Sequence, residues 1–274
     1  MHLGCLPPLK LPFPQLLDAV ASVELKHVGV SPQAFGDLTP SQVRAECRRS
    51  GVAVSSMWAR GIRPGMTDPA EIERGLAALE ETLRIAREID CPVVCTGGGH
   101  PGGYTLNVGN RRPGLLEEVI ECWRRAVPLL ERYDVYLSVE TGIHTSVHKP
   151  DHYAEIFQRI GSKYVSLTMD VVNMLSAEDY YDQHPKIDAL FDRARGYVTS
   201  AHLKDIVHEE RLHTHLNEAA PGDGHLDWEH VLAHLDRALP SWGTGFIEAT
   251  PWDAMPRAVA FVKARARAVG MPID

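Results

Sequence analysis

The chain has 274 residues, of which 44% are hydrophobic and 23% are charged. This is the usage of an ordinary globular protein, and it excludes collagen-like, fibrous and largely disordered chains. The 28 basic and 36 acidic side chains leave a formal net charge of −8 at pH 7. That sign is wrong for a protein that binds nucleic acid through phosphates or lies on an anionic membrane, so we expect neither partner.

The sequence shows no targeting signal and no cysteine motif of the kind that binds zinc or forms a redox pair. No apolar run approaches the roughly 20 residues of a membrane-spanning helix, and residues 1–10 do not read as a secretory leader. The five cysteines form no CxxC pair and have no zinc-ribbon spacing. We interpret them as reduced, mostly buried side chains and expect a cytoplasmic location.

Eight short β-compatible segments alternate with amphipathic, helix-length segments, which is the pattern of a parallel sheet built from βα units. The expected strands are His2–Leu6, His27–Val30, Val52–Trp58, Pro92–Thr96, Val135–Glu140, Val165–Asp170, Val198–Asp205 and Gly245–Thr250. The expected helices are Pro14–Ser22, Pro40–Ser50, Pro69–Ile89, Leu115–Arg132, Asp151–Ile160, Ile187–Arg195, Trp228–Ala238 and Pro256–Val269.

Local signals refine these helices. Thr39, Asp68 and Asp227 stand where N-caps belong, and Pro128 is expected to kink or split its helix. Eight βα units, without a low-complexity linker or an early GxGxxG, favour a closed barrel over an open dinucleotide-binding sheet. We therefore predict an α/β fold with a single (β/α)8 TIM-barrel domain over residues 1–274.

Four late strands each carry a metal-capable side chain at the carboxyl end, where the chemistry of such barrels lies. These residues are Glu140, Asp170, His202 and Glu248. A carboxylate among apolar strand residues is costly unless it is paired, and a shared divalent cation removes that cost. Two glutamates, one aspartate and one histidine suit Mn²⁺, which we favour, as well as Mg²⁺ or Co²⁺, and they tolerate Zn²⁺.

The late motifs give the chain a family resemblance along nearly its whole length. They are Ser-Val-Glu140-Thr, Met-Asp170-Val-Val-Asn, Ala-His202-Leu-Lys-Asp, Pro221-Gly-Asp-Gly-His-Leu-Asp-Trp228 and Phe-Ile-Glu248. In order and spacing the sequence resembles the xylose-isomerase-like barrels, which include sugar epimerases, keto-inositol isomerases and hydroxypyruvate isomerases. The resemblance implies that Glu140, Asp170, His202 and Glu248 bind one divalent metal, and that the two glutamates move protons.

Two positions depart from the epimerase pattern. Asn173 replaces a histidine that those enzymes carry three residues after the aspartate ligand, and His208 replaces an arginine six residues after the histidine ligand. Both family positions serve substrate binding. We therefore keep Asn173 and His208 as candidate substrate contacts whose partners differ from those in the epimerases.

Other candidates surround the expected mouth of the barrel. His100 lies in a glycine-rich loop after the fourth strand, and Trp58 and Trp252 follow the third and eighth strands, where an aromatic ring can stack on a sugar. Lys204 alternates with His202, so it points inward and needs an anionic partner, either a ligand carboxylate or a substrate oxyanion. His144 is a candidate general base, because histidine titrates near neutral pH.

Two alternative interpretations, each with additional metal ions, are disfavoured. His100-Pro-Gly also occurs in the type IV apurinic endonucleases, which are similar barrels with three zinc ions, but His27 and Trp58 lack the ligand pattern those enzymes need. The net negative charge also argues against a DNA-binding face. His213 and His215 alternate in a segment expected to form a short hairpin over the mouth, and a second metal site there is a minor alternative.

The expected reaction is proton abstraction beside a carbonyl through a metal-stabilised enediolate, which makes the protein an isomerase or epimerase of a keto-sugar or keto-inositol. The alternative is a metal-dependent lyase that resembles the C-glycoside deglycosidases and acts on 3-oxo-glycosides; Asn173 and His144 favour it. A non-catalytic sugar-binding barrel is a third possibility. The expected partners are a small carbohydrate and further copies of the chain, or a small partner subunit if the lyase reading holds.

Overall fold

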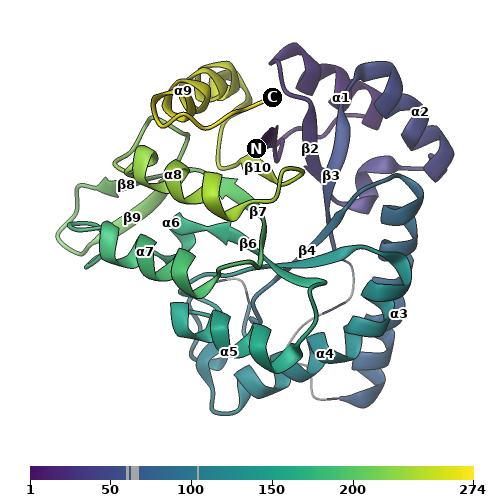
Figure 1. Cartoon of the computed structure of the whole chain (residues 1–274), viewed down its shortest axis with the longest axis horizontal. Coiled ribbons are helices and arrows are strands. Elements are labelled where there is room, and N and C mark those ends of the chain that lie inside the picture. Colours follow the sequence, from purple (N-terminus) through teal and green to yellow (C-terminus); the bar gives the residue numbers. More distant parts are fainter. Residues whose placement is uncertain (60–61, 63–67, 104) are drawn as a thin grey trace.

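A computed structural model describes residues 1–59, 62, 68–103 and 105–274 (Figure 1). Eight parallel strands close into a barrel in the order β1-β10-β7-β6-β5-β4-β3-β2. This confirms the predicted (β/α)8 TIM barrel. The barrel strands are β1 (His2–Cys5), β2 (His27–Val30), β3 (Ala53–Trp58), β4 (Val93–Gly97), β5 (Tyr136–Glu140), β6 (Val165–Asp170), β7 (Val198–Leu203) and β10 (Thr244–Ile247).

Helices surround the barrel on its outside (Figure 1). The long ones are α1 (Phe13–Ser22), α2 (Pro40–Ser50), α3 (Pro69–Glu88), α4 (Leu115–Tyr133), α5 (Pro150–Ile160), α7 (His184–Arg193), α8 (Trp228–Ala238) and α9 (Met255–Ala268). Shorter turns are α6 (Val171–Met174), η1 (Pro32–Phe35), η2 (Val108–Arg111) and η3 (Trp252–Ala254). Within the described part of the chain, none of the helices combines the length and apolar character needed to cross a membrane.

The three expected N-caps are all present. The Thr39 side chain accepts a hydrogen bond from the Gln42 amide, and Asp68 and Asp227 cap α3 and α8 in the same way. Such caps satisfy amides that the first helical turn leaves without partners. They explain why three of the predicted helices start within a residue of their observed positions.

Pro128 lies inside α4, which runs without interruption from Leu115 to Tyr133. Of the two effects expected of this proline, a kink or a split, the split does not occur. Buried side chains on both sides of it, including Trp123 and Leu130, pack into the hydrophobic core. Burial of this stripe holds the two halves of the helix together despite the backbone hydrogen bond that proline cannot make.

An antiparallel hairpin follows β7 outside the barrel. Its strands are β8 (Asp205–Glu209) and β9 (His215–Ala219), so the hairpin expected around His213 and His215 does form. Lys204 and Asp205 were expected to end the seventh barrel strand, but β7 stops at Leu203. Lys204 therefore occupies the junction between barrel and hairpin.

A layer of hydroxyl groups fills part of the barrel interior between β5, β6 and β7. Ser138 Oγ lies 2.7 Å from Thr168 Oγ1, which in turn lies 2.8 Å from Ser200 Oγ. All three residues are buried. Because each hydroxyl both donates and accepts, this layer satisfies its own polar groups and places polar surface two residues below Glu140, Asp170 and His202.

Candidate metal centre

The four expected ligands lie together at the carboxyl ends of four adjacent strands. Glu140 ends β5, Asp170 ends β6 and His202 is the penultimate residue of β7, in register with Asp170. Glu248 directly follows β10, and its amide donates to the Leu203 carbonyl at 3.0 Å. One ligand atom from each residue lies within 4.8 Å of the other three. Parallel pairing thus brings the four side chains together.

His202 stands at the centre of this group. Its Nδ1 lies 3.1 Å from Glu140 Oε1, 3.2 Å from Glu248 Oε2 and 3.6 Å from Asp170 Oδ2. The Asp170 side chain is fully buried, and that of Glu248 is 27% exposed. Glu248 is therefore the ligand side chain most open to an entering molecule.

Lys204 was expected to need an anionic partner, and in the structure its partners are carboxylates. Its Nζ lies 2.9 Å from Asp170 Oδ2, 3.1 Å from Glu248 Oε2 and 2.6 Å from Glu218 Oε1 on the hairpin. The ammonium group thus already has carboxylate partners. Glu218 was missed by the sequence reasoning, because its contact depends on how β9 folds back over the barrel.

The pKa shifts report a strong excess of negative charge. Burial lowers the pKa of His202, but the carboxylates of Glu248 and Glu140 outweigh burial and raise that pKa well above its usual range. Burial raises the pKa of Glu248, but His202 and Lys204 hold it at about 2. Three carboxylates crowded around one imidazole are the donor set of a divalent cation, and the residues present therefore fit such an ion.

Asn173 lies on the single turn α6 that follows Asp170. Its amide N–H donates to Asp170 Oδ1 at 2.9 Å, and its side-chain Nδ2 donates to Glu140 Oε1 at 3.1 Å. Asn173 was expected to contact substrate. The structure places its side chain on a candidate ligand, where it fixes the orientation of the Glu140 carboxylate.

His144 lies on the loop after β5 and is half-buried. Burial lowers its pKa, although the negative charges of Glu140 and Asp170 act in the opposite direction. Its Cε1 would be 2.6 Å from a Cβ added at Gly142, so the tight packing of its ring requires glycine there. His144 thus lies at the mouth of the barrel, in the field of the candidate ligands.

His100 folds back over the end of β4. A Cβ added at Gly97 would lie 2.4 Å from His100 Cε1, and Gly97 is in register with Glu140. The glycine therefore makes room for the imidazole beside the ligand-bearing end of β5. This places His100 at the mouth, as the sequence suggested.

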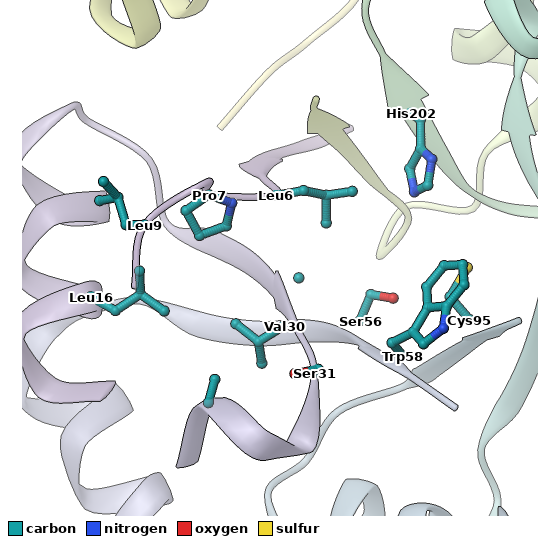
Figure 2. A pocket seen from close by; sticks show the side chains of 12 residues that line it. Leu6, Pro7, Leu9, Leu16, Val30, Ser31, Ser56, Trp58, Cys95 and His202 are labelled. Atoms are coloured by element: carbon teal, nitrogen blue, oxygen red, sulfur yellow. The ribbon is translucent and has the colours of Figure 1, made fainter. Parts of the chain in front are cut away.

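A cavity of about 290 Å³ extends from His202 across the first three strands. Figure 2 shows His202, Trp58 and Cys95 at one end and Leu9 and Leu16 at the other. Most of the remaining lining is apolar, with two serines: Leu6, Pro7, Gly29, Val30, Ser31, Ala34 and Ser56. Among the lining residues only Trp58 was expected as a substrate contact, and His202 as a ligand.

Two other expected substrate contacts lie elsewhere. Trp252, on η3, is half-buried and packs against the hydrophobic core, and His208, on β8, is exposed opposite Leu216. Neither belongs to the described lining of the cavity. The exposed His213 and His215 also stay outside every metal-capable cluster found among the described residues.

The sequence model of the xylose isomerase-like TIM barrel family matches residues 17–258 of the chain. The chain belongs to this family. No curated protein matches the sequence. At the level of structure, this family member resembles a 3-keto-D-glucoside 4-epimerase from E. coli with a TM-score of 0.78 at 15% identity, covering 96% of this chain and 99% of that one.

Two further solved structures resemble this family member. A D-psicose 3-epimerase from Clostridium cellulolyticum H10, solved with D-tagatose, has a TM-score of 0.74 at 13% identity, covering 99% of this chain and 100% of that one. A xylose isomerase-like barrel from Mycobacterium smegmatis, in complex with magnesium, has a TM-score of 0.71 at 16% identity, with 95% and 91% covered. At these identities the likeness shows the shared fold.

Asp205 is a buried carboxylate of this xylose isomerase-like barrel that the sequence reasoning missed. It accepts hydrogen bonds from the Gly222 and Leu226 amides and from Trp228 Nε1, each at 2.9 Å, as well as from its neighbour's amide. A Cβ added at Gly224 would lie 2.4 Å from Asp205 Oδ1. The Pro-Gly-Asp-Gly motif therefore wraps around a structural carboxylate, and its glycine makes the close approach possible.

Proposed function

We propose that this protein is a divalent-metal-dependent isomerase or epimerase of a keto-sugar or keto-inositol, with Glu140, Asp170, His202 and Glu248 as the metal ligands. The observation that carries the proposal is the arrangement of two glutamates around one imidazole, with one ligand atom from each of the four residues within 4.8 Å of the others. Two of the structurally similar proteins are sugar epimerases, which supports the same reaction class here.

A divalent ion, when bound, acts as a Lewis acid on a substrate carbonyl and so makes the neighbouring carbon more acidic. One glutamate then takes the proton from that carbon. If the other glutamate returns a proton to the opposite face, the carbon is inverted. If a proton is returned to the former carbonyl carbon instead, and the hydroxyl proton of the first carbon passes to the former carbonyl oxygen, the carbonyl moves. Asn173 keeps the Glu140 carboxylate in a fixed orientation, and Lys204 does the same for Glu248.

The donor set also bears on the metal. Three carboxylates and one imidazole form an oxygen-rich site, which suits Mn²⁺ first and Mg²⁺ or Co²⁺ next, while Zn²⁺ fits less specifically. Among the similar structures, the barrel from Mycobacterium smegmatis was solved with magnesium and the IOLI protein with zinc, which supports a divalent ion here. We favour Mn²⁺.

The apolar cavity supports a second candidate, a lyase that acts on 3-oxo-glycosides. A free hexose carries hydroxyl groups along its length, and apolar walls such as Leu9 and Leu16 would leave those hydroxyls without partners. An apolar cavity of about 150 Å³ already holds benzene, so the 290 Å³ here is large enough for an aryl aglycone. In this reaction His144 is the candidate base, and a small partner subunit is expected.

One experiment separates the candidates. Metal-loaded and chelator-treated protein are incubated in deuterated water with keto-sugars, keto-inositols and aryl 3-oxo-glycosides, and substrate is followed by NMR. An isomerase or epimerase exchanges the proton beside the carbonyl, whereas the lyase releases the aglycone. Both activities should require metal. Absence of exchange and of release with every compound, in protein shown to contain metal, would contradict both candidates.

A further inference from the structure

A histidine-rich cluster lies on the outer helical layer, away from the barrel interior. Asp188 comes from α7, and His230 and His234 come from the neighbouring helix α8 (Figure 1). Each imidazole Nε2 lies 2.8 Å from the same Asp188 oxygen, Oδ1. One ligand atom from each of the three residues lies within 4.8 Å of the other two. The cluster belongs to neither candidate reaction.

The rings of this cluster are held in place before any ligand arrives. His230 and His234 are four residues apart, so they share one face of α8. His184 stacks on His230 with 4.0 Å between ring centroids, and Phe191 stacks on His234 at 4.8 Å. His184 is itself anchored, because its Nε2 lies 2.8 Å from Asp227 Oδ2. Little side-chain freedom therefore remains to be lost on binding.

We infer that Asp188, His230 and His234 form a second divalent-cation site, of the kind that binds Zn²⁺. Ligands about 2.1 Å from a tetrahedral ion lie about 3.4 Å from one another. The two 2.8 Å contacts therefore need to open by only about 0.6 Å. Three protein ligands leave the fourth coordination position of the ion open. This position would face solvent on the side of Asp188, which is half exposed, whereas His234 is only 15% exposed.

The donor atoms of this site and of the proposed barrel site favour different ions. Two imidazoles and one carboxylate are nitrogen-rich, which favours Zn²⁺ over Mg²⁺ or Mn²⁺. Burial lowers the pKa of His234. Burial raises the pKa of Asp188, but hydrogen bonds from His230 and His234 outweigh it and leave that pKa below its usual value.

The proposed ion has a structural consequence. Its ligands come from two different helices, so it would join α7 to α8 on the outside of the barrel. An ion that binds only the folded chain stabilises it. Once the concentration of the ion exceeds its Kd, this stabilisation grows with the logarithm of the concentration, and the melting temperature rises with it. Zinc should therefore stabilise the protein through this site, whatever happens in the barrel.

The test counts zinc ions. The full chain is dialysed against Zn²⁺, and metal content is measured for the wild type, for His230→Gln/His234→Gln and for a matched control, His213→Gln/His215→Gln. The control removes two exposed histidines from the hairpin and leaves the cluster intact. We expect the cluster variant to bind one Zn²⁺ fewer per chain than wild type, and the control to bind as many as wild type.

A second measurement keeps the inference testable if the cluster variant does not fold. Wild-type crystals are soaked in Zn²⁺, and anomalous diffraction at the zinc edge should show an ion between Asp188 Oδ1 and the two Nε2 atoms. Equal zinc content in wild type and cluster variant, or no anomalous peak at this position at saturating zinc, would overturn it. Neither result depends on whether the barrel site is catalytic.

Discussion

The Lys204 ammonium lies 2.9 Å from Asp170 Oδ2, and the two side chains are 2% and 0% exposed. A fixed cation thus contacts a residue that we propose as a metal ligand. The charges of Glu140, Asp170 and Glu248 are balanced by this one ammonium and one divalent ion when His202 is neutral. The relationship explains why a lysine can lie inside the proposed cation site without excluding the cation.

Replacing Lys204 with methionine should therefore destabilise the metal-free protein. Loss of one member of a buried ion pair leaves its partner charged and unpaired, which costs about 3–5 kcal/mol. Chemical denaturation of chelator-treated protein measures the loss. Lys263→Met serves as the control, because Lys263 pairs with an exposed Glu24 at 3.4 Å and should change stability by less than about 1 kcal/mol. Equal effects of the two substitutions would contradict this account.

Chelation should abolish activity and lower the melting temperature. The bound ion stabilises only the folded state, so the shift should grow with the concentration of added metal. Differential scanning calorimetry of chelated and Mn²⁺-loaded protein provides the measurement. Protein that takes up no metal after Mn²⁺ loading, by elemental analysis, would show that the four ligands do not form the proposed site.

Glu140→Gln and Glu248→Gln should each lower turnover by about 10²-fold or more while leaving the fold intact. The change keeps the shape of the side chain but removes the basic carboxylate. Steady-state kinetics, with circular dichroism and metal content measured on the same samples, distinguishes lost chemistry from lost metal. Wild-type turnover in both variants would exclude the glutamates as the proton-transfer pair.

His144→Ala distinguishes the two reactions. For the two-glutamate isomerase or epimerase we expect a higher KM and little change in kcat, because His144 then lies outside the path of the proton. For the lyase we expect kcat to fall by about 10²–10⁴. Kinetics at several pH values, with metal content held equal, decide between them. A collapse in kcat would make His144 the base and set aside the two-glutamate mechanism.

Acidification should lower the stability of the folded protein, and His27 should account for part of this loss. Burial lowers its pKa to about 4, the nearby His2 adds to this effect, and Asp274 opposes it. An unfolded histidine titrates near 6.5, so the unfolded chain takes up the proton first. Stability is therefore fully present above about pH 6.5 and declines as the pH falls towards about 4.

The variant His27→Gln tests this pH dependence. Glutamine is able to keep a hydrogen bond to Ser55, whose Oγ lies 2.7 Å from His27 Nδ1, but it does not titrate. The melting temperature of the variant should fall less than that of wild type between about pH 6.5 and 4. His213→Gln, on the exposed hairpin, is the control. An identical fall in the His27 variant and wild type would contradict the assignment.

The grouping of Glu140, Asp170, His202 and Glu248 could be predicted from sequence because these residues carry distinctive chemistry in a regular context. Glu140 and Asp170 end runs of β-branched and apolar residues, and parallel pairing then determines that they meet. His202 follows by the same argument. The predicted end of the seventh barrel strand was wrong at Lys204 and Asp205. Nothing in the local sequence pattern separates the last residue of the barrel strand from the first residue of the hairpin.

The cavity could not be predicted in this way. Leu6, Leu16 and Val30 look like ordinary core residues, and only the packing of three strands and their loops shows that they line a space beside His202. The role of Asp205 could not be predicted for a related reason. The four groups that donate hydrogen bonds to its carboxylate lie as far along the chain as Trp228, and only the folded loop brings them together. Such contacts depend on tertiary structure, which a strand or helix period does not encode.

The barrel closes by pairing β1 with β10, the first and last barrel strands of the chain. Glu248, which follows β10 directly, is consequently the last of the four proposed ligands to be synthesised. A growing chain on the ribosome already holds Glu140, Asp170 and His202 while its first strand still lacks a neighbour on one side. Glu248, the third carboxylate of the proposed site, arrives together with barrel closure. We therefore expect the cation to be acquired by the finished protein after synthesis, rather than to serve as a nucleus for its folding.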